Sequence, residues 1–262
     1  MMKRLYLLAC GLIAVTASAA VPVSAPSAPA LTADQIVERN VAARGGLDVW
    51  RAVKTMTLAG HLGAGGKNDT QLPFVMQMKR PRMSRLEIRF GDDTAVQVYD
   101  GEHGWKLRPF LGRNEVEAYT PAEAKSAASW QELDGPLIDH ARKGTRVELL
   151  GTDTVEGHTA YTLKLTFKSG EERRLWIDAS TFLELKSDGD SRKLDGKMHK
   201  VAIYSRDYKV EHGLQVPHVL ETVVEGDKFT YKMNIERVTV NPALDQALFA
   251  ELQPAKLTTV SK

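Results

Sequence analysis

The residues that could perform chemistry do not form a recognisable catalytic motif. The glycine-rich run from Gly60 to Lys67 resembles a phosphate-binding loop, but its first glycine is misplaced by one position and Asn68 follows the lysine. Such a loop also requires a strand before it and a helix after it, whereas extended patterns flank this run on both sides. We therefore interpret it as a hairpin loop.

The sequence also contains no convincing motif for metal binding or for nucleophilic catalysis. The seven histidines are scattered along the chain, and surface or turn positions explain them. Asp188-Gly-Asp190 resembles the start of a calcium loop, but Arg192 occupies the next ligand position, which favours a solvated turn. There is no G-x-S-x-G nucleophile motif. We predict no catalytic residue, no metal site and no cofactor, and an enzyme acting on a lipid or glycan is a minor alternative.

One polar cluster is of more interest, the basic run Lys79-Arg-Pro-Arg-Met-Ser-Arg85. Its simplest interpretation is a strand end with solvated charges, and the alternatives are a lipid-headgroup contact or a docking patch. The chain as a whole has 35 basic and 33 acidic residues and a net charge of +2. No overall field therefore draws it to nucleic acid or to an anionic membrane.

The N-terminal residues predict export. Lys3 and Arg4 precede an apolar run, and small residues follow up to Ala19, which is the layout of a cleaved secretory signal peptide. The apolar run is shorter than the roughly 20 residues of a transmembrane helix. We expect a signal peptide over residues 1–19, a disordered Pro/Ala-rich lead-in over 20–31 and a periplasmic mature protein. Lipid attachment at Cys10, the only cysteine, is the weaker alternative because few apolar residues precede it.

The elements that position these residues are mostly short strands. From Thr55 onward apolar residues recur with a period of two, most clearly over residues 161–167. About ten such runs are separated by turn-rich segments. This spacing predicts an antiparallel meander that is too large to remain flat.

Helices are predicted at two places. Thr32 and Gln35 have the spacing of a capping box and begin a helix of about three turns. Thr120 and Glu123 begin a second one, and a further short helix over residues 137–144 completes a central pair. The sheet therefore has only these helices available to cover its apolar face.

Three stretches together resemble the LolA-like family of envelope lipoprotein carriers, in its longer outer membrane lipoprotein-sorting branch. They are Met78-Lys-Arg-Pro81; Val98-Tyr-Asp-Gly-Glu-His-Gly-Trp105 with Pro109-Phe110; and Asp207-Tyr208 through Pro217 with the closing run Asn241–Phe249. The resemblance implies one mainly β domain over residues 32–262. Its expected fold is a half-open antiparallel β-barrel, lidded by the N-terminal helix and the central helix pair.

The resemblance also implies a function. It predicts a periplasmic carrier that binds a lipid, or the acyl chains of a lipoprotein, in an apolar cavity and passes it across the envelope. The expected partners are this ligand, an inner-membrane donor or exporter and an outer-membrane acceptor, and the expected state is a monomer. A non-transporting ligand-binding or sensor module of the same fold is the alternative.

The expected site residues follow from the strand pattern and from the resemblance. The cavity is expected to be lined by Met56, Leu58, Phe74, Met76, Met78, Leu86, Ile88, Trp105, Tyr161, Leu163, Leu165 and Phe167. The expected lid residues are Ala127, Trp130, Leu133, Leu137 and Ile138. Arg80 matches the arginine of the family's K-R-P motif, which implies a latch at the rim that bonds helix carbonyls near Gly135 or Gly144. Arg82, in the same basic run, is expected to have no part in this latch and so to serve as its control.

Overall fold

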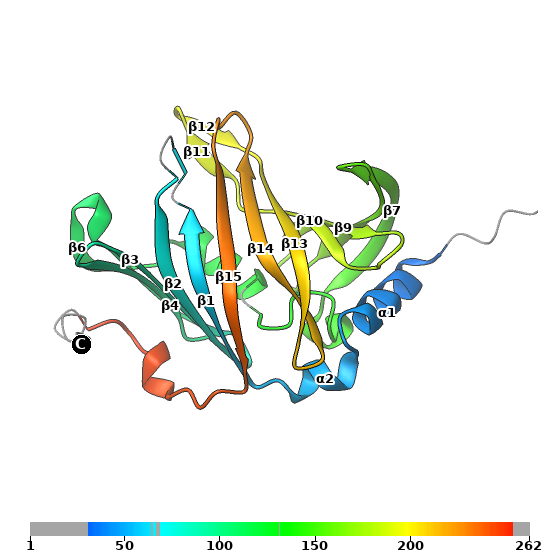
Figure 1. The fold of residues 1–262 in the computed structure, drawn as a ribbon, viewed down its shortest axis with the longest axis horizontal. Helices are drawn as coiled ribbons and strands as arrows, with labels where there is room; N and C mark the ends of the chain where they lie inside the picture. The colour runs from blue at the N-terminus through cyan, green and yellow to red at the C-terminus, as the bar shows by residue number, and fades with distance from the viewer. Residues whose placement is uncertain (1–30, 64, 67–68, 131, 254–262) are drawn as a thin grey trace, which may run out of the picture. The chain divides into compact units, whose positions relative to one another are not determined.

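The structure is a computed structural model that describes residues 31–63, 65–66, 69–130 and 132–253. The predicted signal peptide, Cys10 and the lead-in up to Ala30 lie outside the described residues. Within the described part, no helix is both long enough and apolar enough to cross a membrane. The same part contains fifteen strands, of which thirteen form one antiparallel sheet (Figure 1).

The sheet consists of two meanders. The first comprises β1 (Thr55–Gly63), β2 (Gln71–Lys79), β3 (Met83–Phe90), β4 (Asp93–Tyr99), β5 (Gly104–Arg108) and β6 (Arg113–Ala118), with a 3-10 turn η1 (Pro109–Leu111) before β6. The second comprises β7 (Arg146–Val155), β8 (His158–Thr166), β9 (Glu172–Asp178), β10 (Glu184–Asp188), β13 (Val201–Glu211), β14 (Leu214–Val224) and β15 (Thr230–Val240). Strands β11 (Arg192–Leu194) and β12 (Lys197–His199) form a separate hairpin. The prediction of about ten strands was too low because short strands such as β10, β11 and β12 carry little apolar alternation.

One long-range pair, β1 with β15, joins the two meanders, so that β6 and β7 are the two edges of the sheet. The sheet does not close between these edges, and the predicted half-open antiparallel barrel is confirmed. The face that carries Met56, Met76 and Leu86 is called the inner face, and the face that carries Gln77 and Arg85 is called the outer face.

The connection between the two edge strands is the lid, defined as residues 119–145. Because it runs from β6 at one edge to β7 at the other, it must cross the sheet, and its apolar side chains pack on the inner face. It contains α3 (Pro121–Trp130) and α4 (His140–Lys143). The second helix of the predicted pair is shorter than expected, because Leu137 and Ile138 lie in the turn before α4.

Two helices precede the sheet, α1 (Ala33–Ala43) and α2 (Leu47–Ala52). The predicted capping box is confirmed: the Thr32 hydroxyl accepts from Gln35 N, and the Gln35 side chain accepts from Thr32 N. Helix α1 buries Ile36 and Val37 in the cluster formed by β8, β9 and Leu137 of the lid. The N-terminal helix therefore covers the second meander.

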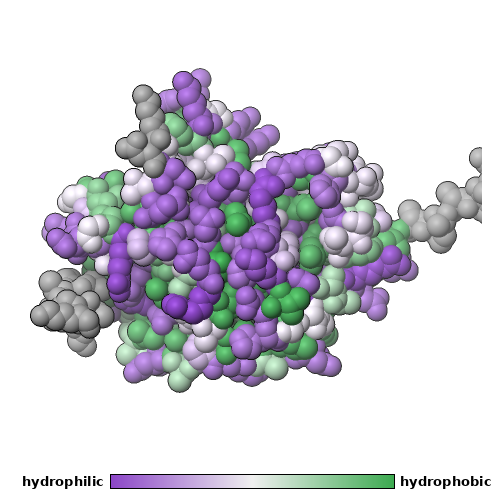
Figure 2. All heavy atoms as spheres, in the orientation of Figure 1, coloured by the Kyte–Doolittle hydropathy of each residue, from purple (hydrophilic) through white to green (hydrophobic). Residues whose placement is uncertain are grey.

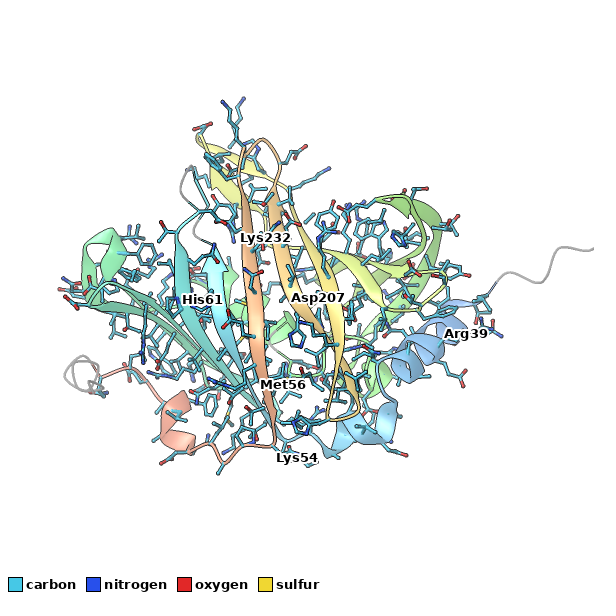
Figure 3. The ribbon with its side chains drawn as sticks, viewed as in Figure 1. Arg39, Lys54, Met56, His61, Asp207 and Lys232 are labelled. Carbon is cyan, nitrogen blue, oxygen red and sulfur yellow. The ribbon has the colours of Figure 1, made fainter. Side chains whose placement is uncertain are left out.

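The outer face is polar in its middle. Figure 2 shows mostly hydrophilic side chains over β1, β15 and β14, with separate hydrophobic spots. His61 on β1 pairs with Glu236, and Lys232 pairs with Glu221 (Figure 3). The residues after β15, 241–253, are called the closing segment. This segment contains the 3-10 turn η2 (Gln246–Phe249) and covers another part of the sheet, where Phe249 is fully buried.

Candidate functional site

The apolar residues predicted on β1, β2 and β3 share the inner face. Met56, Leu58, Phe74 and Met78 are buried in one cluster with lid residues Leu133 and Ile138, and the residues packed half-buried against this cluster include Met76, Leu86 and Ile88. Cross-strand pairing explains the shared face, because directly paired residues in antiparallel strands point to the same side. The lid buries one part of this apolar surface and leaves another part only partly buried.

The residues predicted on β8 lie on the same face, beneath α1 and the lid. Leu163, Leu165 and Phe167 are buried with Leu137 of the lid, and Tyr161 packs half-buried against them. Leu137 and Ile138 are neighbours in the chain but belong to different apolar clusters. The lid therefore connects the two apolar halves of the inner face.

The prediction for Trp105 was wrong. It pairs with Val98, and Val98 pairs with Arg85, which places all three on the outer face. There Trp105 packs against Val96, Val98 and Leu252 of the closing segment. The error arose because β5 is a short strand, and its apolar residues Trp105 and Leu107 fit either face equally well.

The D-G-x-x-x-W motif that carried part of the resemblance forms the turn between β4 and β5 and contacts Tyr119 at the start of the lid. The Asp100 carboxylate accepts from the backbone N–H groups of Glu102 and His103 and so closes the turn between β4 and β5. Tyr119 donates its backbone N–H to the Gly104 carbonyl at 2.8 Å. A Cβ on Gly104 would lie only 2.1 Å from the Tyr119 ring, so glycine is required there.

Helix α3 is attached near both edges of the sheet. Lys106 on β5, which is buried, donates to both oxygens of Glu123 at 2.6 Å. Burial opposes ionisation of Glu123, but hydrogen bonds from Lys106 and Thr120 outweigh it and lower the pKa of this carboxyl. Farther along α3, Ser126 donates to Asp190, which also binds Arg173 of β9. Ala127 is buried, while the side chain of Trp130 lies outside the described part.

Asp134 is the centre of the lid's attachment to the rest of the domain. Its side chain is only 2% exposed. Arg80 Nη2 donates to Oδ2 at 2.8 Å, and Lys143 Nζ donates to Oδ1 at 2.7 Å. Arg44 Nη1 donates to the Asp134 backbone carbonyl at 2.8 Å. A buried carboxylate is stable only when charges and donors of this kind surround it.

Arg80 lies at the lid as the resemblance implied, but its acceptors differ from those expected. Besides Asp134, it donates from Nε to Val53 O at 2.7 Å and from Nη2 to Trp50 O at 2.9 Å. The Gly135 carbonyl instead accepts from Lys143. Sequence reasoning missed Asp134 because it is 54 residues from Arg80, and its only signal was an acid within an otherwise apolar turn.

Further ion pairs hold the same part of the lid. Arg82, expected to have no part in the latch, donates to Ala128 O at 3.0 Å and lies 3.8 Å from Glu132. Arg51 of α2 binds both oxygens of Asp139, and this hydrogen bonding lowers the pKa of the Asp139 carboxyl. The basic run around Arg80 is thus divided: Arg80 and Arg82 contact the lid, whereas Arg85 binds Glu87 and the Leu248 carbonyl.

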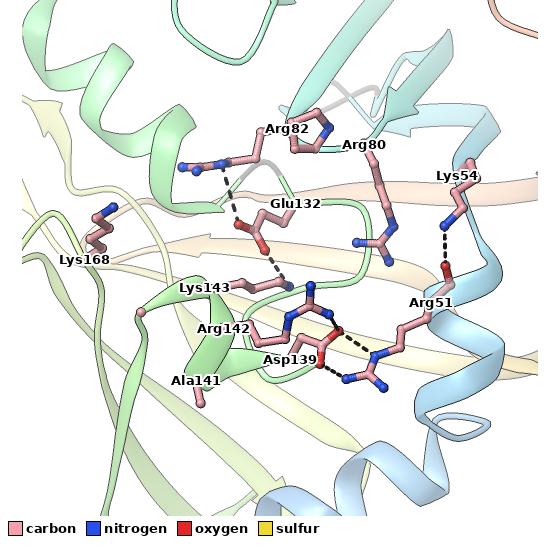
Figure 4. Close-up of a pocket in the computed structure, with 12 residues that line it drawn as sticks. Arg51, Lys54, Arg80, Arg82, Glu132, Asp139, Ala141, Arg142, Lys143 and Lys168 are labelled. Atoms are coloured by element: carbon pink, nitrogen blue, oxygen red, sulfur yellow. Dashed lines mark hydrogen bonds and ion pairs between the residues drawn. The ribbon is translucent and has the colours of Figure 1, made fainter.

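These ion pairs surround a pocket of about 860 Å³ at the end of the sheet (Figure 4). Its lining comes from α2, the turn between β2 and β3, the lid and the turn after β8. The lining residues are Arg51, Lys54, Arg80, Pro81, Arg82, Glu132, Asp139, Ala141, Arg142, Lys143, Gly144 and Lys168. A second pocket of about 320 Å³ shares Arg82, Glu132, Lys143 and Lys168 with it and extends to Phe167 of the inner face.

One prediction about a histidine needs correction. His218 is buried rather than at the surface: its Nδ1 lies 2.7 Å from the Ile235 carbonyl, and its Nε2 lies 3.1 Å from Glu211. Asp190 is 62% exposed, as expected for a solvated turn, and Asp190 and Asp188 bind Arg173 and Arg174 respectively. Among the described residues, no cluster of three or more histidine, cysteine or acidic side chains could hold a metal ion.

The fold is found in solved structures, although sequence comparison detects no relative. No family model matches the chain, and no curated protein matches it. A LolA superfamily protein from Nitrosomonas europaea matches with a TM-score of 0.57 at 14% identity, over 85% of this chain and 99% of its own. A DUF1329 family protein from Desulfovibrio piger matches with a TM-score of 0.55 at 14% identity, over 84% and 97%.

A third solved structure carries a functional description. It is an outer membrane lipoprotein-sorting protein domain from Vibrio parahaemolyticus, with a TM-score of 0.52 at 12% identity, over 82% of this chain and 94% of that one. The matches span nearly the whole of each relative. At such low identity they establish the architecture, and the resemblance inferred from sequence motifs is confirmed at that level: the chain has a LolA-like fold.

Proposed function

We propose that the protein is a non-catalytic carrier of the cell envelope that binds a ligand with acyl chains on the inner face of its sheet, beneath the lid. The observation that carries this proposal is the divided inner face: Met56 and Met78 are buried with residues of the lid, while Met76, Leu86 and Ile88 are only partly buried. Burying acyl chains on such a surface contributes about 0.8 kcal/mol per CH₂ group. Methionine side chains adapt to chains of different shape.

The lid fits the requirements of release. A carrier must protect its ligand in water and give it up at a membrane, so its cover must be held without being locked. Here the cover is held at several points by ion pairs that centre on Asp134 and Glu123. The predicted signal peptide supports a periplasmic location, with a donor in the inner membrane and an acceptor in the outer membrane. Relatives of the same fold include a lipoprotein-sorting domain.

The test is lipid content and lipid transfer. Protein purified from a bacterial periplasm should release lipid on organic extraction, and delipidated protein should move a fluorescent phospholipid between vesicles. Met76→Glu places a charge on the partly buried section of the inner face and should slow transfer. Val210→Glu makes the same kind of change at a residue that is 67% exposed and should not. Protein that is free of lipid and inactive in transfer would overturn the proposal.

A further inference from the structure

The pocket at the lid has an excess of positive charge that its own carboxylates do not balance. Seven basic side chains line it, against Glu132, Asp139 and the adjoining Asp134, a formal excess of four positive charges. The net charge of the whole chain is only +2. Most of this excess is therefore compensated elsewhere, and the pocket is a local concentration of basic groups.

The carboxylates that line the pocket are already paired with basic side chains. Asp139 binds Arg51 through both oxygens, and Arg142 lies 3.6 Å away with a side chain that is 75% exposed. Lys54 Nζ donates to the Arg51 carbonyl, and among the described residues neither Lys54 nor Lys168 forms an ion pair. A cleft lined by one sign of charge attracts counter-ions. Arginine and lysine are the residues that proteins use for phosphate groups.

We propose that this pocket binds a phosphate-type headgroup of the acyl-chain ligand. The inference rests on the proposed function, because it places the polar end of the same ligand. A volume of about 860 Å³ is far larger than a free phosphate ion of five heavy atoms needs and lies within the usual range for small-molecule sites. The adjoining pocket shares Lys143 and Lys168 and reaches Phe167, a member of the apolar cluster on the inner face. Basic and apolar surfaces thus meet as they would around an amphiphile.

A simple cluster of solvated strand-end charges explains the pocket less well. The basic residues come from four parts of the chain, α2 with Lys54, the turn between β2 and β3, the lid and the turn after β8, and they converge on one hollow (Figure 4). The carboxylates of Glu132, Asp134 and Asp139 offset part of the repulsion among these like charges, but the formal excess of positive charge remains. A bound phosphate group would reduce the remaining repulsion.

The test uses charge-removing variants that leave the lid's ion pairs intact. Lys54→Gln with Lys168→Gln removes two positive charges from the pocket. Lys193→Gln with Lys228→Gln removes two from exposed positions on β11 and between β14 and β15. Calorimetry with glycerol 3-phosphate should give a Kd roughly tenfold or more weaker in the pocket variant. The control variant should bind like the wild type.

A second measurement separates a headgroup from free phosphate. Fluorescent phosphatidylglycerol and diacylglycerol with the same acyl chains should be transferred at different rates, the former faster, and the pocket variant should lose this preference. Equal rates for both lipids, or a preference that survives in the pocket variant, would overturn the inference even where transfer itself persists. Tighter binding of inorganic phosphate than of glycerol 3-phosphate would also overturn it. Transfer of neither lipid, with pocket-dependent binding of glycerol 3-phosphate, would overturn the proposed function and support the anion site.

Discussion

Replacing Arg80 by leucine should loosen the lid without unfolding the sheet. The change removes three hydrogen bonds, but only the one to Asp134 connects the lid with the rest of the domain, since the other two end on Trp50 and Val53. A charge-assisted hydrogen bond contributes about 1.5–3 kcal/mol. Losing this one should make lid opening about 10- to 150-fold more frequent. Lys143 remains bound to Asp134 and keeps the buried carboxylate paired.

The assay is native-state hydrogen exchange. In the lid, the Gly135 and His140 amides donate to Glu132 and Leu137, and their protection should fall by the factor given above. Amides in the β1–β15 pair should keep their protection. Transfer of a fluorescent lipid to acceptor vesicles should change in the same variant.

A matched control separates this effect from a general loss of charge. Arg237→Leu removes an exposed arginine of β15 that forms no ion pair among the described residues. Arg82→Leu is unsuitable as a control, because Arg82 also contacts the lid. Unchanged protection of the lid amides in Arg80→Leu, or an equal fall throughout the sheet, would show that Arg80 does not hold the lid.

Three further outcomes are expected. Burial would raise the pKa of Asp178, but hydrogen bonds from Ser180 and Thr181 outweigh it and lower this pKa to about 2 from an ordinary 3.8. The ionised carboxylate therefore stabilises the fold by roughly 2 kcal/mol above about pH 4, and this contribution is lost as pH falls through 2. Denaturation of Asp178→Asn and of the wild type across this range should show their difference in stability disappearing. Leu163→Glu should lower the free energy of unfolding by about 3–5 kcal/mol, because no basic residue lies opposite it. Leu165→Glu should cost less, since Arg173 is its cross-strand neighbour. Intact mass spectrometry of exported protein should give a chain that begins at Ala20, and a diacylated Cys10 would contradict this.

Local signals in the sequence predicted the local elements well. The capping boxes at Thr32 and Thr120 and the strand over residues 161–167 depend on neighbours within a few positions, and the structure has all three. The sequence did not show in the same way which residues of β5 point to the inner face, and this led to the error at Trp105.

The polar part of the site was out of reach for a different reason. Asp134 meets Arg80 and Arg44 only because the lid folds back over 54 and 90 residues respectively. Arg51, Arg142 and Lys168 are ordinary surface residues in the sequence and become one basic pocket only when α2, the lid and the β8–β9 turn converge. The sequence motif that contains Arg80 indicated where the lid is held, but the residues that pair with Arg80 could be identified only from the tertiary structure.

Among the described strands, one pair, β1 with β15, joins the two meanders in the sheet, and this affects the order in which the protein can fold. Neighbouring strands within a meander are consecutive in the sequence or nearly so, whereas the β1–β15 pair joins residues 56–62 with residues 233–240. Loop closure over such a sequence separation is slow, so hairpins should form early and the β1–β15 pair late. A chain that crosses a membrane N-terminus first would therefore keep its two meanders unpaired with each other until β15, the last of the described strands, has crossed.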